Sequence, residues 1–357
     1  MNVFYLSSGY DGCCYLRLYL PCIHNGYKTD KPSRIGGKIP AKAVSQLVRG
    51  SDVVVFHRAE EPEYYDLAKM LKKDGVKIVM DNDDTFKLAD THPLANFQPD
   101  GSAVDNLQRR SDNLDKFMKL SDMVTTSTEF LAKEYRAVNP NVRVLPNCVN
   151  PQDWDTPLKN ETDKVRIGIV GSAALEYDYI HVKDTLRALS ARNDVELVLF
   201  GLGDKKHRKN NPTVTKVFKE EYAFWDSLNI DHFPWVKNHV YQEALNDMRL
   251  DFMIVPRKDN YFNRCKSNVK FLEAAMLEIP VIAQSFKDGP YEEILHKQNG
   301  ILIRRNEMWE TEINNLIKHK YKREYLGRNA KQYVLDNYNI EDKAYLWEEA
   351  YTSLFNK

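Results

Sequence analysis

Cysteine is scarce in this sequence, and its spacing suits neither a metal site nor a disulfide framework. The 357 residues contain five cysteines, an odd number, and no two of them form a Cys-x-x-Cys pair. Structural zinc sites and disulfide-rich folds need clustered or paired cysteines, so both classes are disfavoured. We therefore expect free thiols and a reducing compartment, the cytoplasm.

An excess of charge is also missing. Lys plus Arg total 51, and Asp plus Glu total 51. A dedicated nucleic-acid binder usually has a basic surplus, so this class is disfavoured, although the basic run at 205–209 leaves room for a local patch.

Long apolar runs are absent as well. None approaches the roughly 20 residues that span a bilayer, and no signal peptide is recognisable at the start. We expect no integral membrane segment, while peripheral contact with a membrane stays open.

Strands and helices alternate through most of the chain. Strands are predicted at 3–6, 52–56, 76–80, 122–125, 142–145, 165–170, 195–200, 251–255, 281–283 and 300–303. Strands separated by helices predict an α/β fold with parallel, doubly wound sheets. The segment 146–158 interrupts this pattern with three prolines and no apolar periodicity. We interpret it as a linker between two domains, 1–150 and 151–338.

The stretch 264–283, RCKSNVKFLEAAMLEIPVIA, predicts a loop, a helix and a buried strand. Ser267 is a good N-cap, so we expect the helix to begin there. Lys266 and Lys270 lie near the helix N-terminus, whose unpaired N–H groups favour an anion such as a diphosphate. Glu273, three residues after Lys270, can accept hydrogen bonds from a sugar diol. The alternative is a surface helix with a solvated charged face.

This stretch resembles the donor-site segment of GT-B glycosyltransferases, the family 4 group especially. In that group an acidic residue precedes, by eight positions, a second Glu in a run like LEAMACGTPVVA. Here LEAAMLEIPVIA keeps the second as Glu273, whereas Cys265 stands at the first position and opens a Cys-Lys-Ser-x-x-Lys variant. The resemblance implies two Rossmann-like parallel-sheet domains facing a central cleft. It places the donor on the second domain and the acceptor on the first, which a C-terminal helix at 340–355 completes.

Two sets of residues are expected to line that cleft. The donor-side residues are Gly171, Ser172, Gly201, Arg257, Lys266, Ser267, Asn268, Lys270 and Glu273. The acceptor-side residues are Gly9, Gly12, Arg17, Asp81 and Asp84, with Asp83 beside them. Two of these positions have open alternatives: Arg17 as an ordinary surface residue, and the acidic run DNDD at 81–84 as a solvated strand end. Trp235 is either a contact of the donor base or a core residue.

The predicted function is transfer of a sugar from a nucleotide-diphosphate sugar to a hydroxyl acceptor, a hexosyltransferase-like activity. Lys266, Lys270 and the helix N-terminus would stabilise the leaving diphosphate, and Glu273 would orient the donor sugar or ribose. Asp83 or Asp84 would position or deprotonate the acceptor. The resemblance implies retention of configuration and no metal, although DNDD also suits Mg²⁺ or Mn²⁺.

No cofactor is expected beyond the nucleotide-sugar substrate. The acceptor classes left open are a glycan, a lipid-linked sugar and a modified nucleic acid. The alternative functions are a nucleotide-sugar epimerase, a non-catalytic nucleotide- or sugar-binding protein, and a phage-type glycosyltransferase acting on a modified DNA base.

Overall fold

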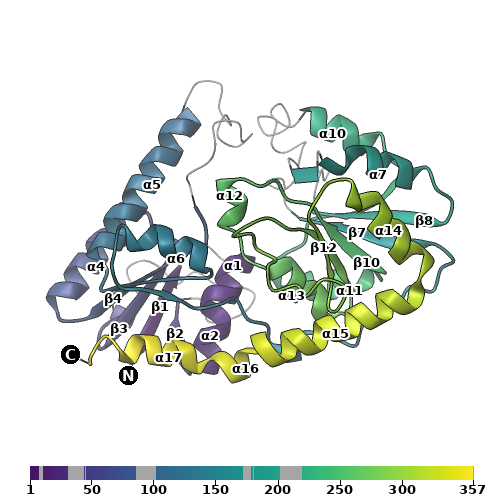
Figure 1. The fold of residues 1–357 in the computed structure, drawn as a ribbon. Coiled ribbons are helices and arrows are strands. Elements are labelled where there is room, and N and C mark those ends of the chain that lie inside the picture. Colours follow the sequence, from purple (N-terminus) through teal and green to yellow (C-terminus); the bar gives the residue numbers. More distant parts are fainter. Residues whose placement is uncertain are drawn as a thin grey trace.

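The computed structural model describes residues 1–7, 11–30, 44, 46–85, 102–171, 178–179, 181–201 and 219–356. Two six-stranded sheets make up the fold, with strand orders β2-β1-β3-β4-β5-β6 and β12-β11-β10-β7-β8-β9 (Figure 1). Neighbouring strands are parallel throughout both sheets. The prediction of doubly wound α/β sheets is therefore confirmed. The domain boundary drawn at residue 150 stays a prediction.

The first sheet and its helices come from the first 150 residues. The strands are β1 Val3–Ser7, β2 Lys28–Thr29, β3 Val53–His57, β4 Lys77–Asp81, β5 Met123–Thr126 and β6 Val142–Val144. The helices are α1 Gly12–Cys14, η1 Tyr15–Tyr19, α2 Leu20–His24, α4 Pro62–Lys73, α5 Ser102–Leu120 and α6 Glu129–Arg136.

The second sheet and its helices follow the linker. The strands are β7 Val165–Val170, β8 Val195–Phe200, β9 Ile230–Phe233, β10 Phe252–Val255, β11 Val281–Gln284 and β12 Ile301–Ile303. The helices are η3 Pro151–Asp153, α7 Lys183–Ser190, α10 Lys219–Asp226, η5 Asn238–Val240, α11 Tyr241–Asp247, α12 Tyr261–Arg264, α13 Val269–Met276, α14 Met308–Lys318 and α15 Lys320–Tyr338.

The first sheet is covered on both faces because its strands are apolar at successive positions. Val54 and Phe56 of β3 belong to the core under α4, α5 and α6, whereas Val53 and Val55 face α1, η1 and α2. Alternate side chains of a strand point to opposite faces, so a run such as VVVF must be buried on both sides.

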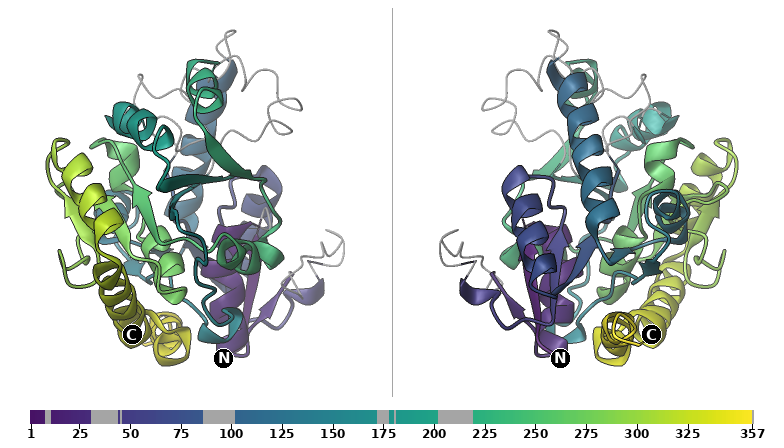
Figure 2. Two further views of the ribbon diagram at one scale, coloured as in Figure 1. Left: turned by 90° about the vertical axis from the view of Figure 1, so that its right-hand side faces the viewer. Right: turned by 90° about the vertical axis from the view of Figure 1, so that its left-hand side faces the viewer.

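The chain returns to the first sheet at its C-terminus. The helix expected at 340–355 is divided at Ala344 into α16 (Ile340–Lys343) and α17 (Tyr345–Thr352). Trp347 is buried in the core of the first sheet, and the hydroxyls of Tyr351 and Tyr5 lie 2.7 Å apart. Both termini consequently lie at the same end of the molecule (Figures 1 and 2).

Pro21 lies in the first turn of α2, and a π-helical turn, η1, ends two residues before it. Proline has no N–H to donate to the preceding turn, and π-type turns accommodate such interruptions. Arg17 lies within this turn and is fully buried.

Candidate functional site

The carboxyl ends of β7 and β8 form a tight backbone junction at the predicted donor side. Gly171 N donates to the carbonyl of Phe200 at 3.1 Å. Gly201 has a φ of +77°, and a Cβ there would lie 2.5 Å from the Gly171 carbonyl oxygen. Both properties require glycine at position 201. Ser172, Gly9 and the basic run at 205–209 fall outside the described residues.

Lys270 and Glu273 lie on one face of α13, as their spacing predicted. Lys270 Nζ is 2.8 Å from Glu273 Oε2 and 2.9 Å from the hydroxyl of Tyr241. That hydroxyl donates to the same Oε2 at 2.8 Å. Burial opposes the charge on Lys270, but the Glu273 carboxylate and the Tyr241 oxygen outweigh it and raise the lysine pKa. Lys270 is thus a charged partner of Glu273.

The start of α13 corrects one prediction. The helix begins at Val269, after Asn268, and Ser267 is not its N-cap. The hydroxyl of Ser267 instead accepts a hydrogen bond from Asn147 Nδ2 of the linker at 2.9 Å, and Asn268 donates to Glu293. The residues before the helix are therefore tied to the linker and to the loop after β11.

Lys266 bonds across the cleft. Its Nζ lies 2.8 and 2.9 Å from the two carboxylate oxygens of Asp84, and 4.0 Å from the ring centroid of Phe262. The lysine predicted for the donor thereby meets the carboxylate predicted for the acceptor. Both side chains remain about a quarter exposed, at 21% and 26%, so a ligand can reach the pair.

Cys265, at the position of the first acidic residue in the resembled motif, is fully buried. It packs in the core of the first sheet beside Tyr261, whose ring also contacts Phe130 of α6 at 5.7 Å. Burial raises the pKa of its thiol to about 12. The group is neutral at pH 7, and this part of the second half of the chain is anchored in the first.

The three carboxylates of the DNDD run at 81–84 bind different partners. Asp81 is buried and receives hydrogen bonds from Arg17 Nη2 at 2.6 Å and Thr125 Oγ1 at 2.7 Å. His57 Nδ1 lies 2.9 Å from its other oxygen. The surface alternative for Arg17 is therefore wrong. Burial works against an ionised Asp81, but Arg17 and His57 outweigh it and lower its pKa.

Arg58 is a cleft residue that the sequence analysis did not single out. Its φ is +48°, and its Nε donates to Asp83 at 2.7 Å. Its other nitrogens lie 3.6 Å from Asp84 and 3.7 Å from Asp11. Burial raises the pKa of Asp83, but Arg58 outweighs it, and the net shift is downward. The sequence signal that could have identified Arg58 was a basic residue directly after a buried strand. Within the described residues, no group of three or more His, Cys, Asp or Glu is placed to hold a metal ion.

Arg257 and Trp235, two further candidates from the second half of the chain, differ in burial. Arg257 is buried, at 3.2 Å from Asp178 and 3.3 Å from Asn263 Oδ1. These partners hold it inside the second half of the chain. Trp235 is 64% exposed, so its interpretation as a core residue is wrong.

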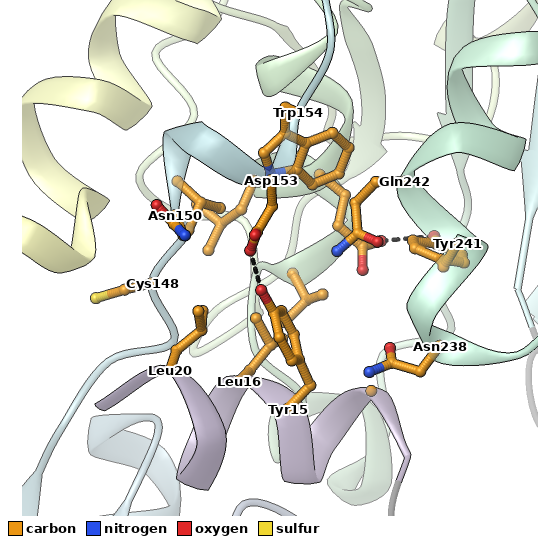
Figure 3. A pocket seen from close by; sticks show the side chains of 15 residues that line it. Tyr15, Leu16, Leu20, Cys148, Asn150, Asp153, Trp154, Asn238, Tyr241 and Gln242 are labelled. Atoms are coloured by element: carbon orange, nitrogen blue, oxygen red, sulfur yellow. Dashed lines mark hydrogen bonds between the residues drawn. The ribbon is translucent and has the colours of Figure 1, made fainter. Parts of the chain in front are cut away.

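Two cavities lie between the halves of the chain. A narrow one of about 30 Å³ is lined by Gly12, Tyr15, Asn238, Tyr241 and Glu273, among others. Figure 3 shows Tyr15 and Leu16 facing it from one side, and Asn238 and Tyr241 from the other. Two of its lining residues are joined by a hydrogen bond, which the Tyr15 hydroxyl donates to Asp153 of the linker.

The larger cavity, of about 320 Å³, lies between the N-terminus of α6, the linker, the residues before α13 and the loop after β11. Lys266, Ser267 and Asn268 line it. The predicted donor segment thus lines both cavities, with Glu273 at the narrow one and residues 266–268 at the larger one. Among the described residues, no helix combines the length and apolar character needed to cross a bilayer.

Residues 181–349 match a protein-family model described as glycosyl transferase-like. No curated protein matches the chain. The match covers α7 to most of α17 and includes Lys266, Lys270 and Glu273. This part of the chain is therefore similar to glycosyl transferases, in agreement with the predicted glycosyltransferase enzyme.

Solved structures resemble the whole chain. Sucrose-phosphate synthase from Thermosynechococcus elongatus covers 100% of both chains at 13% identity, with a TM-score of 0.65. HepE from Anabaena, in complex with UDP-glucose, covers 99% of this chain and 100% of its own at 12% identity and a TM-score of 0.65. A glycosyltransferase from Rickettsia africae covers 99% and 98% at 13% identity and a TM-score of 0.61. These likenesses confirm the predicted GT-B fold.

Proposed function

We propose that the protein transfers a sugar from a uridine diphosphate sugar to a hydroxyl acceptor. The observation that carries this proposal is Glu273, a carboxylate at the cavity between the two halves, which Gly12 of α1 also lines. A carboxylate in this place suits a vicinal diol of the donor. The glycosyl transferase-like match and the UDP-glucose complex of HepE support the choice of donor.

The donor diphosphate would lie between the glycine junction of β7 and β8 and the residues before α13. A backbone without side chains at Gly171 and Gly201 allows close approach of a phosphate. Lys266 supplies the accessible cation, because Lys270 is committed to Glu273. Within the Cys265-Lys266-Ser267-x-x-Lys270 segment, Lys266 would thus be the lysine that binds the donor diphosphate. This charge stabilises the leaving diphosphate as the glycosidic bond breaks.

Asp84 is the carboxylate best placed for the acceptor. Asp81 and Asp83 are buried and form ion pairs with Arg17 and Arg58, respectively. Asp84 is partly exposed and forms an ion pair with Lys266. When the diphosphate takes over Lys266, Asp84 is released to accept a hydrogen bond from an acceptor hydroxyl. We further propose retention of anomeric configuration and independence of metal ions, with residues 1–150 as the acceptor domain and 151–338 as the donor domain.

A donor screen tests the proposal. UDP, GDP, ADP and dTDP sugars are incubated with and without candidate glycans, lipid-linked sugars and glucosylatable DNA, and released nucleoside diphosphate is measured. We expect release from a UDP sugar, unaffected by EDTA, and a product with the donor's anomeric configuration by NMR. Interconversion of the free nucleotide sugar would indicate an epimerase. Binding without turnover would indicate a non-catalytic protein.

A further inference from the structure

Glu273 presents its two carboxylate oxygens unequally. Oε2 accepts hydrogen bonds from Lys270 Nζ and from the Tyr241 hydroxyl, both at 2.8 Å, and these two donors are themselves 2.9 Å apart. Oε1 accepts no hydrogen bond from the part of the chain that the structure describes. One oxygen is thus held by the protein, and the other is left for a ligand at the cavity that Glu273 lines.

We propose that Tyr241 and Lys270 are positioning residues, which fix Oε2 of Glu273 so that Oε1 receives the ribose diol of the donor nucleotide. This inference rests on the proposed function. It gives Lys270 a different role from that of a diphosphate ligand, and it assigns a role to Tyr241, which carries no charge.

The contact triangle is anchored in three separate elements. The Tyr241 ring, from α11, is stacked on Phe200 at the end of β8, with centroids 5.5 Å apart and planes 16° from parallel. Lys270 Nζ lies 5.1 Å from the centroid of the same ring. Glu273 projects from α13, whose neighbouring Leu272 is buried in the core. A carboxylate held by two hydrogen bonds loses little freedom when it binds a hydroxyl, which favours affinity.

The charge of Lys270 also suits an anionic ligand. A lone carboxylate near a diphosphate would repel it, most strongly at a partly buried site where screening is weak. The ammonium group of Lys270 cancels that charge while leaving Oε1 able to accept a hydrogen bond. The pair therefore recognises hydroxyls close to phosphate without net repulsion.

The test compares UDP with 2′,3′-dideoxyuridine diphosphate, which lacks only the ribose hydroxyls. Calorimetric titration of wild type should show UDP binding about 10- to 100-fold more tightly, as expected for charge-assisted hydrogen bonds. Tyr241→Phe, which keeps the stacked ring, and Lys270→Met should reduce this ratio to about threefold or less. They should do so by weakening UDP, with the dideoxy ligand nearly unchanged. Lys270→Arg should restore part of the ratio.

Matched controls are Tyr325→Phe and Lys320→Met on the exposed side of α15, which should keep the wild-type ratio. If both cleft variants are folded and keep the wild-type ratio, the positioning role is overturned. A wild-type ratio near one overturns the ribose assignment of Glu273, while UDP binding itself would still support the donor site. If wild type binds neither ligand, the proposed UDP-sugar function falls together with this inference.

Discussion

Lys266 and Asp84 form an ion pair across the cleft, in which Lys266 Nζ lies 2.8 and 2.9 Å from the two carboxylate oxygens of Asp84. They come from opposite halves of the chain, and both are partly exposed. The pair joins the halves, and it also occupies the one lysine of the donor segment that is free of Glu273. A diphosphate must compete with Asp84 for this lysine.

Asp84→Asn should therefore have opposite effects on binding and on transfer. Without the competing carboxylate, Lys266 is available to phosphate, and UDP should bind several-fold more tightly, a change of about 1 kcal/mol. Transfer should fall because the acceptor hydroxyl loses its carboxylate. Calorimetry with UDP and a steady-state transfer assay measure the two effects.

The control is Glu129→Gln, which removes an exposed carboxylate paired with Arg136 on α6. It should leave both quantities unchanged. If Asp84→Asn weakens UDP binding, the competition between Asp84 and the diphosphate is refuted.

The buried pair of Arg17 and Asp81 should dominate local stability. Arg17 is fully buried and also donates to the carbonyl of Leu145 and to Asn147 Oδ1 at 3.3 Å. Arg17→Met removes the guanidinium partner of the buried Asp81 and leaves it only His57 and Thr125, which should lower the free energy of unfolding by about 3–5 kcal/mol. Urea unfolding measures this loss. Arg17→Met combined with Asp81→Asn should recover part of it, and a double variant as unstable as the single one would contradict this explanation.

The fold could be predicted from the sequence because the patterns that indicate its strands and helices lie within short stretches of the chain. Apolar runs such as 53–56, ended by turn residues, predict buried strands, and ten strands near the predicted positions are present. Two strands that were not predicted, β2 and β9, are short or weakly apolar. Their positions depend on pairing with β1 and β8, which a local pattern does not reveal.

The candidate site was only partly predictable. The spacing of Lys270 and Glu273 on one helix face determines their contact, so that pair was found. The partners of Lys266 and Ser267 are Asp84 and Asn147, which are 182 and 120 residues away. Such partners follow from the docking of the two halves, and no spacing in the sequence indicates them. Tyr241 was missed for the same reason.

Acid should destabilise the protein through Asp81 and Asp83. Their folded-state pKa values are lowered, because the guanidinium groups of Arg17 and Arg58 outweigh the cost of burial. A lowered pKa gives stability that is fully present above the unfolded value, about 3.9, and is lost as pH falls below it towards the folded value. Urea unfolding at pH 7, 4 and 3 should show this loss. Asp83→Asn should flatten the dependence below pH 4, and an unchanged slope would contradict this origin.

Gly201 and Gly26 offer a comparison that separates backbone strain from crowding. Both have positive φ, +77° and +65°, but only Gly201 has a neighbour that a Cβ would strike, the Gly171 carbonyl oxygen at 2.5 Å. Gly26→Ala should cost about 1 kcal/mol of unfolding free energy, from the left-handed backbone alone. Gly201→Ala should cost at least about 2 kcal/mol, because the junction of β7 and β8 must also move apart. It should weaken UDP binding as well, whereas Gly26→Ala should not. Urea unfolding and calorimetry of the two variants provide the comparison. Equal stability losses would show that the contact with Gly171 relaxes freely and does not shape the donor side of the cleft.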